Sequence, residues 1–209
     1  MALEPVPTMH VATRRIGAVE ANVLAAGWQQ VAPVRLRDTV TGGEPRQGTE
    51  LRVAIDGGDL RVLFECTDAD PWATLVKRDD MLFTEEVVEV FLDPVGDLEC
   101  YFEFEVNPLN TVMDLVLRKS PSGLRKDFGW QCEGLRHAVQ RTAHGWTAEL
   151  AIPFESLMPG SAHRQAWRCN FYRIDRPKGE SAPELTAWSP TGLPQFHVTE
   201  RFGYLIFAD

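Results

Sequence analysis

The chain has 209 residues, of which 44% are hydrophobic and 24% are charged, a composition typical of a soluble globular protein. Its formal net charge is −9, and a surface of that sign repels phosphate backbones, so we expect no nucleic-acid partner. No stretch reaches the roughly 20 consecutive apolar residues of a membrane-spanning helix, so we expect no membrane partner either. Oligomeric state is left open by these properties.

The N-terminal segment, residues 1–35, is loosely patterned and is predicted to form an arm on a single domain that spans residues 1–209. Its first residues, Met1–Pro7, lack a basic region followed by an apolar one, so no secretory signal is visible. The sequence therefore fits a cytoplasmic protein, or a secreted or periplasmic one whose leader has been removed, and does not choose between them.

From residue 49 onward, short runs with alternating or apolar patterning predict β-strands, and turn signals recur about every ten residues. The predicted strands cover Thr49–Ile55, Leu60–Thr67, Val87–Pro94, Tyr101–Pro108, Val112–Leu117, Leu135–Arg141, Trp146–Ile152, Trp167–Ile174 and Phe202–Phe207. Helical periodicity is almost absent. The pattern favours an all-β fold, an antiparallel β-sandwich.

Three segments interrupt the strands. Asp68–Thr84 and Arg176–Leu193 are long polar loops, and loops of that length inside a compact domain are usually functional. Lys119–Asp127 is a basic excursion that contains Pro, Gly and Ser.

Two strands carry the strongest chemical signal, because each has one apolar face and one face rich in carboxylates. On the strand Val87–Pro94 the second face presents Glu89 and Asp93 beside Phe91, and on Tyr101–Pro108 it presents Tyr101, Glu103, Glu105 and Asn107. Carboxylates and an amide next to aromatic rings suit a polyhydroxylated ligand or a hard cation.

The same carboxylates leave an enzyme open as an alternative. Glu103 and Glu105 lie two apart on one strand, roughly 7 Å from each other, and Glu89 could join them in a glycoside hydrolase. A solvated or ion-paired face explains alternating glutamates more simply. Neither a G-x-S-x-G motif nor a phosphate-binding glycine loop is present, which weighs against catalysis.

Six tryptophans supply candidate stacking surfaces for a sugar. Trp146 fits the core, Trp130 and Trp167 are undecided, and Trp72 and Trp188 lie in the two long loops. For Trp188 a binding and a structural role are equally favoured, whereas for Trp72 packing is ahead.

Acidic loop residues give a weak metal signal. Asp68 and Asp70, or alternatively Asp79 and Asp80, offer the oxygen ligands that calcium prefers, although turn chemistry explains them as well. The four cysteines are widely spaced and are predicted to be free thiols.

Several of these segments together resemble the family 9 carbohydrate-binding modules, most closely the family 9-like branch. The resemblance spans about Leu36 to Phe207 and is carried by the following residues: Val87–Asp93, Phe104–Asn107, Gly145–Pro153, Asn170 with Asp175, Trp188–Thr191 and Arg201–Leu205.

The resemblance implies a jelly-roll-like β-sandwich that binds an oligosaccharide or polysaccharide without hydrolysing it. In modules attached to xylanases the ligand is a glucan or xylan chain end held between two tryptophans, with structural calcium elsewhere. The matching ring positions here are Phe83 and Trp188. The polar ligand-binding candidates are Arg78, Glu89, Glu105, Asn107 and Asn170.

The chain departs from the family pattern at three positions. Phe83 replaces a tryptophan, Glu86 replaces the usual aspartate, and Glu105 falls near the place of a binding arginine. These changes keep a third reading open, in which the domain is a structural or interaction sandwich whose sugar site has decayed.

Overall fold

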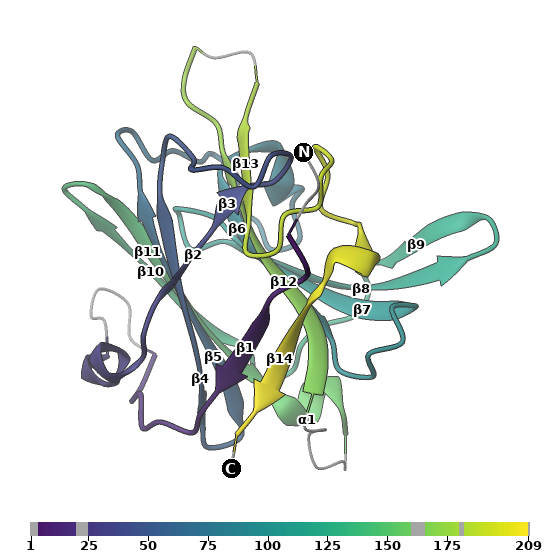
Figure 1. Ribbon diagram of the computed structural model, residues 1–209. Helices are drawn as coiled ribbons and strands as arrows, with labels where there is room; N and C mark the ends of the chain where they lie inside the picture. The colour runs from purple at the N-terminus through teal and green to yellow at the C-terminus, as the bar shows by residue number, and fades with distance from the viewer. Residues whose placement is uncertain (1–3, 20–24, 160–165, 180–181, 209) are drawn as a thin grey trace.

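The computed structural model describes residues 4–19, 25–159, 166–179 and 182–208. Two β-sheets face each other and enclose most of the apolar side chains (Figure 1). The antiparallel β-sandwich predicted from the alternating pattern is therefore confirmed. Among the described strands, the pairing of β1 with β14 departs from this pattern because it is parallel.

The larger sheet has nine strands in the described part of the chain, with its main path in the order β1-β14-β12-β6-β7-β8-β9. Strand β13 pairs with β12, and β3 pairs with β13. The bounds are β1 Thr8–Val11, β14 Gly203–Phe207, β12 Ala166–Asp175, β6 Val87–Asp93, β7 Cys100–Val106, β8 Val112–Ser120, β9 Gly123–Asp127, β13 Glu184–Ala187 and β3 Arg37–Asp38.

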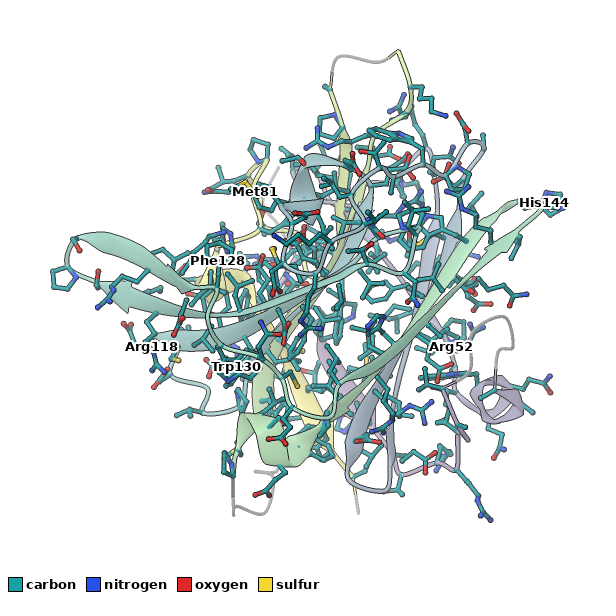
Figure 2. The ribbon with its side chains drawn as sticks, turned by 180° about the vertical axis from the view of Figure 1, so that it is seen from behind. Arg52, Met81, Arg118, Phe128, Trp130 and His144 are labelled. Carbon is teal, nitrogen blue, oxygen red and sulfur yellow. The ribbon has the colours of Figure 1, made fainter. Side chains whose placement is uncertain are left out.

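The smaller sheet has five strands among the described residues, in the order β10-β11-β5-β4-β2. The bounds are β10 Arg136–Thr142, β11 Gly145–Pro153, β5 Asp59–Thr67, β4 Thr49–Asp56 and β2 Val34–Arg35. Figure 2 shows Arg52 of β4 and His144 of the β10–β11 turn on this side of the molecule, whereas Phe128 and Trp130 lie with the larger sheet. The predicted hairpins at residues 49–67 and 135–152 are confirmed.

Helical structure is limited to short turns in the described chain. These are η1 Ala26–Gln30, η2 Leu82–Thr84, η3 Thr199–Arg201 and α1 Phe154–Leu157. None of the helices among the described residues is long and apolar enough to cross a membrane.

The sequence missed the strands that lack a strong alternating pattern. Strand β1 lies within the loosely patterned N-terminal segment, and its Val11 is fully buried against the core. The basic excursion at residues 119–127 is also a paired structure, since β9 pairs with β8 in a hairpin that projects from the body (Figure 1).

The core between the sheets is built from the faces that the sequence assigned as apolar. Val88, Val90 and Phe104 lie there with Trp146 and Phe171. Trp167 belongs to the same core, and Trp130 packs against it with its ring 4.9 Å from that of Phe102. Both undecided tryptophans are therefore packing residues.

The opposite face of the large sheet is also covered, which the alternating pattern did not predict. A second apolar cluster forms there, in which Phe91, Tyr101 and Tyr172 of the sheet pack against Leu82 and Phe196 from loops. Because loops cover this face, the glutamates that alternate with its apolar residues are removed from water.

Candidate functional site

Three glutamates converge on the outer face of the large sheet. Glu89 of β6 lies directly opposite Glu105 of β7 in the antiparallel register, and Glu103 follows two residues away on the same face. An oxygen from each of the three carboxylates lies within 4.8 Å of the others. The sequence predicted this grouping correctly.

The surroundings of these carboxylates differ from the solvated face that an ordinary antiparallel sheet would give. Glu89 and Glu103 are each 2% exposed and Glu105 is fully buried. Burial raises the pKa of Glu105 well above its usual value, and repulsion from Glu89 and Glu103 raises it further. The pKa of Glu89 and that of Glu103 are also raised by burial.

The glutamates form the floor of a cavity of about 360 Å³, a size that suits a small ligand. Phe83 of η2 lines one part of its wall, and Phe196 and His197 line another. The remaining wall is mostly apolar and includes the side chains of Ile174, Pro183, Leu185 and Pro194. The site therefore combines an acidic floor with apolar walls.

Stacked rings hold the loop of Phe196 and His197 on the sheet. The ring of Phe196 stacks on Tyr172 of β12 at 4.2 Å, and the Tyr172 hydroxyl donates to the Phe196 carbonyl at 2.9 Å. His197 stacks on Phe91 at 5.2 Å, and its Nδ1 is 2.9 Å from the Tyr101 hydroxyl oxygen. The alternating aromatics of the sheet thus position the residues above it.

Two basic side chains line the same cavity. The Lys126 ammonium lies 5.6 Å from the centre of the Phe83 ring and 3.2 Å from His197 Nε2. Arg176 donates from Nη2 to the Phe83 carbonyl oxygen at 3.1 Å. Burial, aided by Lys126, lowers the pKa of His197 to about 4, so the imidazole is neutral at pH 7.

The expected pairing of Phe83 with Trp188 across a cleft is wrong. Trp188 is 7% exposed and belongs to the core between the sheets, where its ring meets that of Phe171 at 5.8 Å. Phe83 packs on the opposite face of the large sheet. The Trp188 N–H donates to the carbonyl of Phe171 in β12. This bond holds the backbone of Trp188 against the large sheet, with the ring on the core side.

Asn107 and Asn170 are also corrected, since both fully buried amides are satisfied by the backbone. Asn170 donates to the Ser189 carbonyl and accepts from the Ser189 and Phe171 N–H groups. Asn107 donates to the Leu75 carbonyl and accepts from two N–H groups in the turn that follows β7. These amides fix loops and do not line the cavity.

Arg78 lies outside the cavity as well. It pairs with the buried carboxylate of Asp114 and bonds to Gln131. Of the seven ligand-binding candidates, the structure brings together Phe83, Glu89 and Glu105.

Sequence reasoning missed Lys126, Arg176, Phe196 and His197 as cavity residues, and it assigned Glu103 only to the alternative enzyme. Arg176 opens the long loop that was expected to be functional, and Phe196 and His197 lie just beyond its end. Lys126 belongs to the basic segment, and its place over the cavity depends on the β8–β9 pairing. Local patterning contains no signal for that pairing.

The two candidate calcium ligands, Asp68 and Asp70, have different surroundings. Asp68 is buried with Glu86 and Asp175, and oxygens of these three residues lie within 4.8 Å of one another. Asp70 is exposed and pairs with Lys178 at 2.9 Å. Glu86 and Asp175 are thus the neighbours of Asp68 that could share a cation with it.

An arginine already contacts that second carboxylate cluster. Arg173, 1% exposed, donates from Nη2 to Asp68 at 2.8 Å and to Asp175 at 3.3 Å. Its guanidinium supplies the positive charge that the cluster needs.

A larger cavity, about 480 Å³, lies at one end of the five-stranded sheet and is lined by threonines and by Glu44, Glu50 and Glu65. Its glutamates lie on the surface, where Arg37 pairs with Glu44 and Arg52 with Glu65. The smaller cavity is the stronger candidate because its carboxylates are buried and, in the described part of the chain, pair with no arginine or lysine.

Comparison with known protein families identifies a match to this chain. A family model described as carbohydrate family 9 binding domain-like matches residues 19–209. The chain belongs to this family. The resemblance noted from the sequence is confirmed over nearly the whole chain.

Solved structures share the fold of this chain at low sequence identity. A Bacteroides uniformis protein proposed to bind carbohydrate is 19% identical, with a TM-score of 0.77 and coverage of 98% of this chain and 100% of that one. A family 9 carbohydrate-binding module from Caldicellulosiruptor kristjanssonii in complex with glucose is 14% identical, with a TM-score of 0.69 and coverage of 97% and 96%.

A family 9 carbohydrate-binding module from Caldicellulosiruptor kristjanssonii in complex with cellotriose is also 14% identical, with a TM-score of 0.66 and coverage of 96% of this chain and 93% of that one. A comparison with curated proteins finds no match.

Proposed function

We propose that this family 9 domain binds a carbohydrate without catalysing its hydrolysis, and that the ligand occupies the cavity above Glu89, Glu103 and Glu105. The observation that carries the proposal is the composition of this cavity, in which carboxylates line the floor and an aromatic ring, Phe83, lies in the wall. Sugars need both, because their C–H faces pack on apolar surface while their hydroxyls require hydrogen-bond partners. The sugar-bound Caldicellulosiruptor kristjanssonii structures support a ligand of this class.

The aromatic contribution in this chain is smaller than two facing tryptophans would give. Phe83 is half-buried, and Phe196 is 7% exposed because it stacks on Tyr172. The walls therefore offer one partly open ring and several aliphatic side chains. Specificity then rests mainly on the polar groups, since a buried carboxylate left without a partner is costly.

A glycoside hydrolase is the competing function, because Glu103 and Glu105 lie together beside His197. Acid–base hydrolysis needs two carboxyls whose pKa values are pushed apart, one protonated and one ionised. Burial raises the pKa of all three glutamates here. His197, with its pKa lowered to about 4, is unprotonated at neutral pH and so cannot serve as the general acid. This arrangement favours binding over hydrolysis.

Calorimetric titration of the full chain with glucose, cellotriose, xylobiose and glucosamine tests the proposal. We expect binding of at least one sugar, which Phe83→Ala weakens and the exposed Phe128→Ala does not. Lack of binding to any sugar in a broad glycan panel would support the structural or interaction reading instead. Turnover of chromogenic glycosides that Glu105→Gln abolishes would favour the hydrolase.

A further inference from the structure

Buried carboxylates elsewhere in this protein have a compensating partner. Glu149 pairs with Arg61, Asp114 with Arg78, and Asp68 with Arg173. Other carboxylates accept backbone N–H groups, as Asp93 does from Val95, Gly96 and Leu98. These contacts offset the cost of removing a charge from water.

Among the residues that the structure describes, the three glutamates on the cavity floor have no arginine or backbone N–H partner of this kind. Both oxygens of the fully buried Glu105, and Oε2 of Glu103, have no hydrogen-bond partner outside the glutamate group among the described residues. In the same described part of the chain, no lysine or arginine forms an ion pair with any of the three. Because Glu103 and Glu105 belong to the lining of the cavity, a ligand bound there can supply the partner that these oxygens lack.

The nearest basic groups form no ion pair with these carboxyl groups, although the charge of Lys126 lowers the pKa of all three and so offsets part of the effect of burial. His197 Nδ1 lies 4.0 Å from Glu103 Oε2, but the lowered pKa of this imidazole keeps it neutral at pH 7. Lys126 lies against the Phe83 ring and His197 Nε2, while Arg176 bonds to a backbone carbonyl. Each of the three carboxyl groups therefore lacks an ion pair of its own in the described part of the chain, and the charge of Lys126 offsets their burial only in part.

The walls indicate what kind of cation fits. Calcium takes six to eight oxygen ligands, whereas the other side chains that line this cavity are apolar ones such as Phe83, Ile174 and Leu185, together with the nitrogen-bearing Lys126, Arg176, His197 and Gln195. An organic cation uses both surfaces, because its carbon skeleton packs on the apolar walls while its charge meets the carboxylates. An ammonium group has three N–H donors, one for each glutamate.

We propose that the cavity binds an amino sugar, and that its protonated amine is held by Glu89, Glu103 and Glu105. The inference rests on the proposed carbohydrate binding and specifies the ligand class of that site. Lys126 and Arg176 line the same cavity and can donate hydrogen bonds to the sugar hydroxyls. The raised pKa of each glutamate fits this role, since an arriving ammonium favours ionisation and releases the carboxyl protons.

Calorimetry with three matched β-1,4-linked dimers, of glucosamine, glucose and N-acetylglucosamine, tests the inference at pH 6.5. N-acetylation removes the charge of the amine and keeps the sugar ring. Because hydrogen bonds to charged groups are the stronger ones, we expect the glucosamine dimer to bind at least about tenfold more tightly than the other two. Repeating the titration in buffers of different ionisation enthalpy should show net proton release on binding.

Substitutions identify which carboxylates are responsible. Glu105→Gln and Glu89→Gln keep the side-chain shape and should each remove the preference for the amine. Glu99→Gln, on the exposed segment before β7, is the matched control and should retain it. Circular dichroism of each variant confirms that it is folded.

The outcomes separate this inference from the proposed function. Equal affinity for the charged and neutral dimers, or a preference that survives Glu105→Gln, overturns the amine assignment and leaves carbohydrate binding in place. Binding that EDTA abolishes and calcium restores overturns it in favour of a metal. Failure of every sugar to bind overturns both proposals.

Discussion

Glu89 on β6 and Glu105 on β7 face each other across an antiparallel pair, and both carboxyl groups are buried. Like charges directly opposite on a sheet are destabilising, and burial increases the cost because the charges are not screened by water. The protein keeps this arrangement in the floor of a cavity. We therefore expect these two residues to lower the stability of the folded chain while they contribute to ligand binding, and both effects can be measured.

Replacing Glu105 with Gln should stabilise the protein at neutral pH, by about 1 kcal/mol or more. The pKa of Glu105 is raised above its usual value of 4.5 in the folded state, so the folded chain binds the proton more tightly than the unfolded chain does. Its contribution to stability is greatest below pH 4.5 and is lost as the pH rises toward the folded-state pKa. Urea unfolding between pH 4 and pH 8 measures the effect.

The difference in unfolding free energy between Glu105→Gln and the parent chain should therefore grow with pH. Glu99→Gln provides the control because its carboxylate is exposed. Parallel curves for the parent and Glu105→Gln would contradict the unpaired state of this residue.

Phe83 should set how much stacking energy the cavity provides. Phe83→Trp enlarges the apolar face and should tighten sugar binding, whereas Phe83→Ala should weaken it, each by about two- to tenfold. Isothermal calorimetry with the best-binding sugar of the panel gives both values. The same weakening in Phe128→Ala would argue against a site at Phe83.

Trp188 should behave as a core residue. Trp188→Ala removes a buried ring and should destabilise the chain by about 3–5 kcal/mol. The packing around it is close, since a Cβ on Gly203 would lie 2.4 Å from Trp188 Cζ3. Gly203→Ala should therefore also lower the melting temperature.

Binding measurements on Trp188→Phe complete that test. This milder change should leave sugar affinity unchanged below the melting temperature, because the ring does not line the cavity of the three glutamates. A loss of affinity without a loss of stability would return Trp188 to the binding site.

Arg173 should control whether the second carboxylate cluster binds calcium. Arg173→Met leaves Asp68 and Asp175 without their guanidinium and should cost about 3–5 kcal/mol. Calcium should restore part of that loss, because Glu86 joins the two aspartates in a group of oxygens within 4.8 Å. Differential scanning calorimetry with calcium and with EDTA measures this recovery.

Two controls show whether an effect of calcium depends on Arg173. Arg37→Met, which removes a surface ion pair with Glu44, should show no calcium dependence. If calcium raises the melting temperature of the parent chain as much as that of Arg173→Met, the guanidinium does not exclude the ion. Asp68 would then be a calcium ligand in the native protein.

The sequence by itself determined the fold class and the grouping of the glutamates. Alternation along β6 and β7 fixes which side chains share a face, because the backbone repeats every two residues. Val88 and Val90 were therefore placed in the core, and Glu89, Glu103 and Glu105 together on the other side. Strands β1 and β9 escaped prediction because their formation depends on partners far along the chain or on a hairpin without a strong pattern.

Only the tertiary structure decided what surrounds those glutamates. Trp188, Asn107 and Asn170 were expected at the ligand, but backbone hydrogen bonds direct them into the core and into loop anchoring. Phe196 and His197 take the place above the sheet because Tyr172 and Tyr101 hold them there. The alternation along a strand shows which face of the sheet a residue occupies, whereas the burial of that residue depends on which other segments cover the face. That covering buries Glu89 and Glu105, which form no ion pair with a lysine or an arginine among the residues that the structure describes.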